Sequence, residues 1–189
     1  MDRWILTGKL SAFLAPLVFV LLTSAAVSNY PGYDMSINFL SNLGVGGDSA
    51  VFFNAAAITA GLIVMMLSAA LYKVFNRLRF CKAGALTLAL AGFFLVGVGV
   101  FTADYGILHS FFSVLFFVAV ALTLIEFGWG MRKTSHMGYF SMTMGVLIPF
   151  FFSFGISPFA EHMAVGSVVL WSFGVSIFLK GYRHNPPHE

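Results

Sequence analysis

Charged residues are scarce in this chain. Only 9% of its 189 residues are Asp, Glu, Lys or Arg, and 59% are hydrophobic, whereas a soluble domain carries about 25% charged residues. Such a chain lacks the polar surface that a globule needs in water. Its apolar runs are long enough to cross a bilayer, which takes about 20 residues per helix, and they lack the alternation of barrel strands. The sequence therefore predicts an all-α polytopic membrane protein.

Cysteine is nearly absent as well. Cys81 is the single cysteine, so the chain can form neither an intramolecular disulfide nor a cluster of thiolate metal ligands. The net charge is +3. In membrane proteins an excess of basic residues usually marks the cytoplasmic loops, so this positive charge does not indicate a nucleic-acid partner.

The apolar segments predict six transmembrane helices in a single domain over residues 1–189, without a linker or a second domain. We place the six spans at residues 10–27, 51–72, 83–101, 105–127, 138–154 and 158–179. Ser157 and Pro158 suit the start of the last span, as cap and first helical residue. The first span could instead be a signal peptide, because Ala26-Val27-Ser28 ends in small residues, although its apolar run is longer than usual.

The basic residues predict the orientation. All ten fall on the side that holds the termini and the second and fourth connections: Arg3, Lys9, Lys73, Arg77, Arg79, Lys82, Arg132, Lys133, Lys180 and Arg183. The positive-inside rule then places both termini in the cytoplasm and the other three loops outside the cell membrane. No predicted span carries a charged residue near its centre, which disfavours proton pumps and many ion-coupled transporters.

The longest polar interval lies between the first two spans, at residues 28–54. Asp34 can cap a helix at its start and Gly44 can end it in the left-handed conformation. Between them Met35, Phe39, Leu40 and Leu43 fall on one helical face, while Asn38, Ser41 and Asn42 fall on the other. We expect a short amphipathic helix at the membrane surface in this first outer loop. An ordinary capped connecting loop is the alternative.

Two histidines enter the bundle from the outer side. His109 and His162 each lie about four residues inside a span, so both sit roughly 6 Å below the surface. Asp104 precedes His109 and Glu161 is adjacent to His162. We expect the two imidazoles to face one another in a shallow outward-facing pocket. The ligand-binding candidates around it are Asp34, Asn38, Ser41, Asn42 and Asn54.

This set of side chains is competent for two kinds of chemistry. Imidazole and carboxylate groups suit a divalent metal such as zinc, with one position left for water. A histidine held by a carboxylate can alternatively act as a general base on a headgroup ester or phosphodiester. The catalytic and metal candidates are His109, His162, Asp104 and Glu161. A purely structural polar cluster is equally compatible, since acids are favoured in first helical turns and no spaced H-x-x-x-H motif is present.

The run from Ser36 to Gly44 reads S-I-N-F-L-S-N-L-G, and Phe53-Asn54 opens the next span. This pattern resembles the signature of the domain-of-unknown-function 998 family of six-span membrane proteins, which is similar to the Frag/DRAM/Sfk group. The usual pattern is I-S-x-L-S-D-L-G followed by F-N, so Asn42 stands where Asp is commoner. The resemblance implies six spans and an ordered first outer loop. It implies no established activity, and links of the wider group to lipid remodelling hint at lipids by fold analogy alone.

Three functions follow from these observations. The first is binding of a membrane lipid or small amphiphile in the outer pocket. The second is an intramembrane hydrolase that uses a metal or a His/carboxylate pair on lipid headgroups. The third is a structural or regulatory subunit whose small-residue helix faces contact another membrane protein or a second copy of the chain.

Overall fold

The computed structural model describes residues 3–182 and contains six α-helices. They are α1 (Arg3–Ser28), α2 (Gly47–Val74), α3 (Arg79–Val100), α4 (Ile107–Met131), α5 (His136–Ser153) and α6 (Pro158–Gly181). Two short 3₁₀ helices lie between them, η1 (Leu40–Gly44) and η2 (Ala103–Tyr105). No strand occurs in this described part of the chain. The predicted all-α class is confirmed, and each predicted span coincides with one helix.

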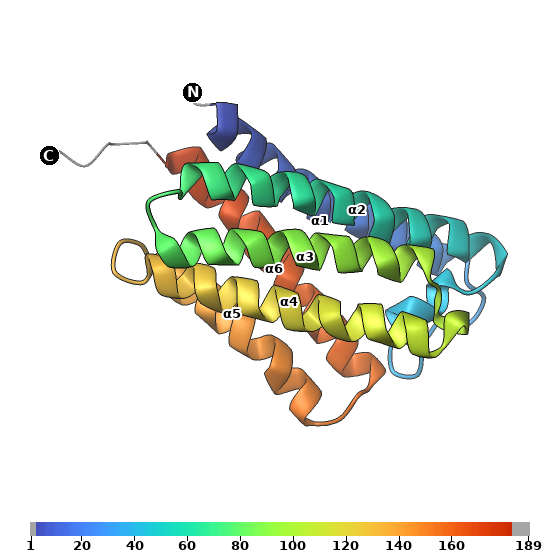
Figure 1. The fold of residues 1–189 in the computed structure, drawn as a ribbon. Coiled ribbons are helices and arrows are strands. Elements are labelled where there is room, and N and C mark those ends of the chain that lie inside the picture. The colour runs from blue at the N-terminus through green and yellow to red at the C-terminus, as the bar shows by residue number, and fades with distance from the viewer. Residues whose placement is uncertain (1–2, 183–189) are drawn as a thin grey trace, which may run out of the picture.

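The helices form an antiparallel ring (Figure 1). Each one packs against the next along the chain, and α6 returns to pack against α1. Both described termini lie at one end, together with the α2–α3 and α4–α5 connections. We call this the basic end, because every Lys and Arg among residues 3–182 falls in its connections or in the adjoining turns of the helices; Arg183 lies outside the described residues. The opposite end carries Asp34, Asp48, Asp104 and Glu161 and is called the acidic end.

Five of the helices are long and apolar enough to cross a membrane: α1, α2, α3, α4 and α6. The chain is therefore a multi-pass membrane protein by the length and composition of its helices. The remaining helix, α5, has 18 residues and is about 27 Å long, slightly less than the ~30 Å hydrocarbon core. That α5 is a sixth span stays a prediction.

Hydroxyl caps determine where the last two helices begin. The Ser135 side chain accepts a hydrogen bond from the Met137 backbone N–H, at 3.1 Å, before α5. The Ser157 side chain accepts one from the Ala160 N–H, at 3.2 Å, before α6. Pro158 is the first residue of α6, where its missing N–H costs no hydrogen bond. The start predicted for the sixth span is confirmed.

The core consists of two clusters of buried side chains. The larger runs along the ring and includes Trp171, whose indole N–H donates to the Ser141 hydroxyl at 2.9 Å. The smaller lies at the acidic end, where Leu40 and Leu43 of η1 pack with Phe53 of α2. The α1–α2 connection is therefore part of the packed structure, and it occupies a fixed place beside the ends of the helices.

Candidate functional site

The α1–α2 connection (residues 29–46) contains a turn over residues 34–37 near its middle. The Asp34 carboxylate accepts from the Ser36 backbone N–H at 2.8 Å and from the Ser36 hydroxyl at 2.6 Å. These hydrogen bonds lower the pKa of Asp34 below its usual value. The turn ends at Ile37, and η1 begins only at Leu40. In place of the single amphipathic helix predicted over residues 35–43, the structure has a turn and a short 3₁₀ helix.

Gly44 ends η1, as predicted, but without the predicted left-handed backbone conformation. Its φ is not positive; the positive-φ glycines of this connection are Gly32 and Gly46, so the expected left-handed conformation is wrong. A Cβ at Gly44 would instead lie 2.6 Å from Asn54 Oδ1 and 3.0 Å from Phe53 Cδ1. The Asn54 amide donates to the Gly44 carbonyl at 3.2 Å. Glycine is therefore required here by the close approach of α2.

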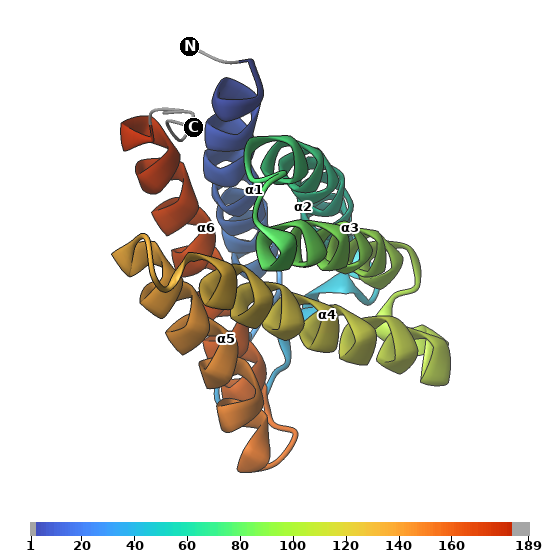
Figure 2. The same ribbon diagram turned by 60° about the vertical axis from the view of Figure 1, so that its left-hand side comes forward.

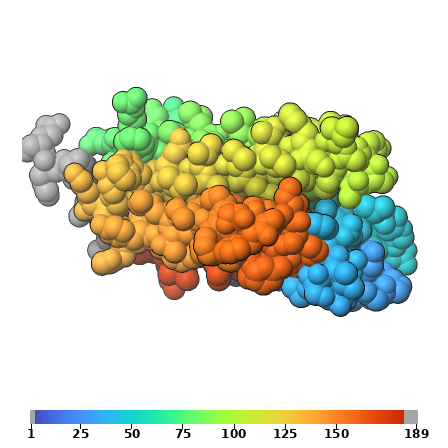
Figure 3. All heavy atoms as spheres, turned by 90° about the horizontal axis from the view of Figure 1, so that it is seen from below, coloured from blue at the N-terminus to red at the C-terminus, as the bar shows by residue number. Residues whose placement is uncertain are grey.

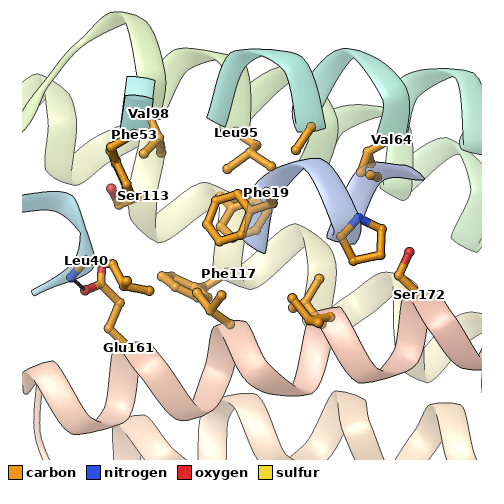
Figure 4. Close-up of a pocket in the computed structure, with 17 residues that line it drawn as sticks. Phe19, Leu40, Phe53, Val64, Leu95, Val98, Ser113, Phe117, Glu161 and Ser172 are labelled. Carbon is orange, nitrogen blue, oxygen red and sulfur yellow. Dashed lines mark hydrogen bonds between the residues drawn. The ribbon is translucent and has the colours of Figure 1, made fainter. Parts of the chain in front are cut away.

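Glu161 of α6 caps η1 from a position far away in the sequence. Its carboxylate accepts from the Leu40 backbone N–H at 2.5 Å (Figure 4), and the Ser41 N–H also bonds to it. The first N–H groups of a helix have no partner within the helix. Phe39, which precedes η1, has no side chain that could cap it. The acid of α6 therefore satisfies the donors that the local sequence leaves open.

His162 makes a second link between this connection and α6. Its Nδ1 lies 2.6 Å from the Pro158 carbonyl oxygen, which can only accept, so Nδ1 carries the proton. The Tyr33 hydroxyl then donates to Nε2 at 2.8 Å. Burial, with the nearby charge of Glu161, raises the pKa of Tyr33 to about 12 and keeps the phenol protonated. Figure 3 shows this connection, in blue, beside the orange surface around the start of α6.

His109 has a different set of partners. Its Nδ1 lies 2.7 Å from the carbonyl oxygen of Phe101, at the end of α3. Its Nε2 lies 3.1 Å from the hydroxyl of Ser113, one turn further along α4. The imidazole is 8% exposed. Both ring nitrogens are thus engaged, and neither contacts an acid.

The structure does not bring the two histidines together around a ligand. His109 bonds to Phe101 and Ser113, whereas His162 bonds to Tyr33 and Pro158. The Asp104 side chain is exposed and accepts from the Thr102 hydroxyl, away from His109. Across residues 3–182 no group of three or more His, Cys, Asp or Glu side chains could hold a metal ion. The expected site of two histidines and their acids is not assembled, and the described side chains provide no zinc ligand set.

The predicted ligand-binding amides mostly hold the α1–α2 connection in shape. The Asn38 side-chain oxygen accepts from the Asp34 N–H at 2.9 Å, and that of Asn42 accepts from the Phe39 N–H at 2.8 Å. Asn54 bonds to Gly44, as described above. Among the five candidates only Ser41 belongs to the cavity described next. Asp34, Asn38, Asn42 and Asn54 therefore act in folding this segment.

A cleft lies between α4 and α5 and extends from the acidic end past the middle of α4. The two helices diverge from their short connection (Figure 2), and α6 with Phe39 and Ser41 of the connection closes the space at the acidic end. Its volume is about 840 Å³, within the ~300–1,000 Å³ of ordinary ligand pockets. Val114, Val118 and Leu122 of its lining are about half exposed. The cleft is therefore open along the flank of the bundle.

Polarity changes along this cleft. At the acidic end its lining includes His109, Ser110, Ser113, Ser41 and Glu161, and further along α4 it consists of apolar side chains as far as Ile125. Sequence reasoning missed the cleft, although its α4 lining recurs at the spacing of one helical face. In a hydrophobic helix, a face that contacts lipid or the protein core has the same residue spacing. The spacing alone therefore could not identify a cleft.

A second, smaller cavity lies inside the ring (Figure 4). Its volume is about 80 Å³, and its lining is almost wholly apolar, with Phe19 of α1 and Phe53 of α2 among its walls. Ser113, Phe117 and Glu161 line both this cavity and the cleft. These three side chains form the partition between the centre of the bundle and its flank.

One of the comparisons with known proteins identifies a family. A family model described as "Protein of unknown function (DUF998)" matches residues 13–179, which covers all six helices for most of their length. No curated protein and no solved structure matches the chain.

Proposed function

We propose that this chain, which belongs to the DUF998 family of membrane proteins of unknown function, binds a lipid or another amphiphile in the cleft between α4 and α5. One observation carries the proposal: the cleft is polar where it meets the acidic end, apolar along the rest of its length, and open at its side. That distribution matches the headgroup and tail of a molecule that enters from the bilayer. The central cavity is too small for such a ligand.

The dimensions fit a lipid tail. From His109 to Ile125 the lining follows α4 over 16 residues, or about 24 Å at 1.5 Å per residue. One leaflet of the hydrocarbon core is about 15 Å thick, half of the ~30 Å total. A tail lying along Phe117 and Ala121 would therefore stay in contact with protein over the full depth of a leaflet. Ser41, Ser110 and Glu161 would meet the headgroup with hydrogen-bonding oxygens.

We further propose that α5 is the sixth span and that the basic end faces the cytoplasm. The concentration of basic residues at one end supports this orientation, because cytoplasmic loops carry the excess of Lys and Arg. The acidic end, with the polar mouth of the cleft, would then lie at the outer surface of the cell membrane. The ligand would come from the outer leaflet.

Cysteine labelling tests the orientation. In a Cys81→Ala background, Asp48→Cys at the acidic end should react with a membrane-impermeant maleimide in intact cells, and Asn76→Cys at the basic end should react only after lysis. Asp48 and Asn76 are both exposed, so access through the membrane alone decides the result. Labelling of position 76 in intact cells would reverse the proposed orientation.

Filling the cleft tests the binding site. Val118→Trp should lower the amount of amphiphile that co-purifies with the protein severalfold, because the indole would occupy the apolar part of the cleft. The measurement is quantitative mass spectrometry of the lipids that remain after repeated detergent exchange. Val118 is 49% exposed, so the substitution should leave the packing of the bundle intact.

Val146→Trp is the matched control. Val146 lies on α5, is 55% exposed and is not part of the cleft lining, so the variant adds the same bulk on a lipid-facing surface. We expect it to retain amphiphile like the unmodified protein. Equal retention by Val118→Trp and Val146→Trp would show that the ligand, if any, binds elsewhere.

A further inference from the structure

We propose that Ser113 and His109 form a nucleophile and general-base pair that cleaves an ester bond of an amphiphile bound in the α4–α5 cleft. The inference rests on the proposed binding function and adds a reaction to it. Both side chains line the cleft near its polar end, and the Ser113 hydroxyl lies 3.1 Å from His109 Nε2. That distance is within the range for proton transfer between a serine and its base.

Ser113 is the helical serine, among the described residues, whose hydroxyl bonds to an imidazole. Ser28, Ser110 and Ser167 donate to the carbonyl four residues earlier, as serine in a helix usually does, and other helical serines donate to a carbonyl of a neighbouring helix. The Ser113 side chain is half-buried and borders both the cleft and the central cavity. A bond to a backbone carbonyl, the common arrangement among these serines, therefore does not account for its orientation.

His109 is held in the tautomer that a general base needs. The Phe101 carbonyl oxygen can only accept a hydrogen bond, so the proton resides on Nδ1, which lies 2.7 Å away. Nε2 is then free to accept the proton of Ser113. In serine hydrolases a third group orients the histidine in this way. Here the carbonyl at the end of α3 takes that place, and the 8% exposure of the imidazole limits competing water.

The reaction balances with an ester and water as its reactants. Ser113 Oγ forms a bond to the acyl carbon while its proton passes to His109 Nε2. The carbon–oxygen bond to the alcohol breaks, and the alcohol leaves with the proton from Nε2. Water then attacks the acyl-serine, gives a proton to Nε2, and releases the fatty acid as that proton returns to Oγ. The hydroxyl of Ser41 lies in the same lining and can donate to the oxyanion.

Covalent labelling tests the pair. The full chain, purified in lipid nanodiscs, is treated with an alkyl fluorophosphonate, in which Ser113 Oγ would displace fluoride from phosphorus. We expect labelling of the unmodified protein at Ser113, none in Ser113→Ala, and at least a hundredfold slower labelling in His109→Gln, because general-base catalysis contributes about 10²–10⁴-fold. Ser28→Ala, which removes an exposed helical hydroxyl at the same end, should label like the unmodified protein.

Thermal stability measured on the same variants separates catalysis from a structural role. Ser113→Ala should lose labelling without a matching loss of thermal stability, because it removes one hydroxyl from the half-buried lining of the cleft. Absence of labelling, or labelling that persists in Ser113→Ala, would overturn the inference. Lipid content measured on the same samples keeps the two proposals distinct. If Ser113→Ala retains the amphiphile but the unmodified protein does not label, binding stands without catalysis.

Discussion

Gly61→Ala is expected to lower the free energy of unfolding by about 1–3 kcal/mol, the usual cost of overpacking a close contact. A Cβ at Gly61 of α2 would lie 2.7 Å from the Gly92 carbonyl oxygen of α3, and a Cβ at Gly92 would lie 2.7 Å from the Gly61 carbonyl oxygen. Both obstacles are backbone atoms that no rotamer change can move. The two helices would have to separate along the contact. Reversible unfolding in mixed detergent micelles measures the difference.

Gly166→Ala is the control for helix propensity. Gly166 lies inside α6, and a Cβ there would meet no atom within 4 Å. Alanine is favoured over glycine in a helix by about 0.5–1 kcal/mol, so this variant should be unchanged or slightly more stable. We therefore expect the free energy of unfolding to fall in Gly61→Ala and to stay the same or rise slightly in Gly166→Ala. Equal stability of Gly61→Ala and Gly166→Ala would show that α2 and α3 can shift apart at little cost.

The helices could be predicted from the sequence because their signals are local. Apolar runs of sufficient length and the cap formed by Ser157 and Pro158 are properties of neighbouring residues, and the six predicted segments coincide with the six helices. The antiparallel order, which groups the basic residues at one end, follows from the short connections. For α5 the same local signal is weaker, since its helix has only 18 residues, and its span is therefore the one that stays a prediction.

The candidate site was harder to predict because it depends on the order of helices around the ring. The predicted depth of four residues inside a helix holds for His162 in α6, whereas His109 lies only two residues after the start of α4 at Ile107. Depth, moreover, says nothing about lateral position. His162 faces the α1–α2 connection, where Tyr33 meets it, and His109 faces the end of α3. His162 and Tyr33 are 129 residues apart in the sequence, and His109 and Phe101 are 8 apart across a helix connection. The spacing of residues within one helix predicts neither contact.

The cleft exists because the axes of α4 and α5 are inclined to one another. The two helices diverge from their connection, and a crossing angle is set by the side chains at the contact. Gly128, Gly138 and Gly145 allow the two helices to approach closely near the basic end. Where the helices separate, Phe117 of α4 and Phe152 of α5, whose ring centroids are 4.9 Å apart, contact each other in the lining of the cleft. These residues could be recognised only after the helices had been placed.

Glu161→Ala should release η1 while leaving the bundle folded. The substitution removes the acceptor of the Leu40 and Ser41 N–H groups, and an unsatisfied buried donor costs about 1–3 kcal/mol. Because η1 packs in the smaller core cluster, that cost should appear as local opening. We expect the Leu40 amide to exchange with deuterium roughly 30-fold faster, which corresponds to about 2 kcal/mol. Amides within α2 and α3 should keep their protection.

Two variants separate the cap from the charge in this last experiment. Glu161→Gln keeps an oxygen that can accept from Leu40 and should recover most of the protection, because the bond needs an acceptor more than a negative charge. Asp48→Ala removes an exposed acid at the same end, in the first turn of α2, and should leave the Leu40 amide unchanged. Uniform loss of protection throughout the chain in Glu161→Ala would mean that the carboxylate stabilises the whole bundle. In that case the link between α6 and η1 would be part of the global fold.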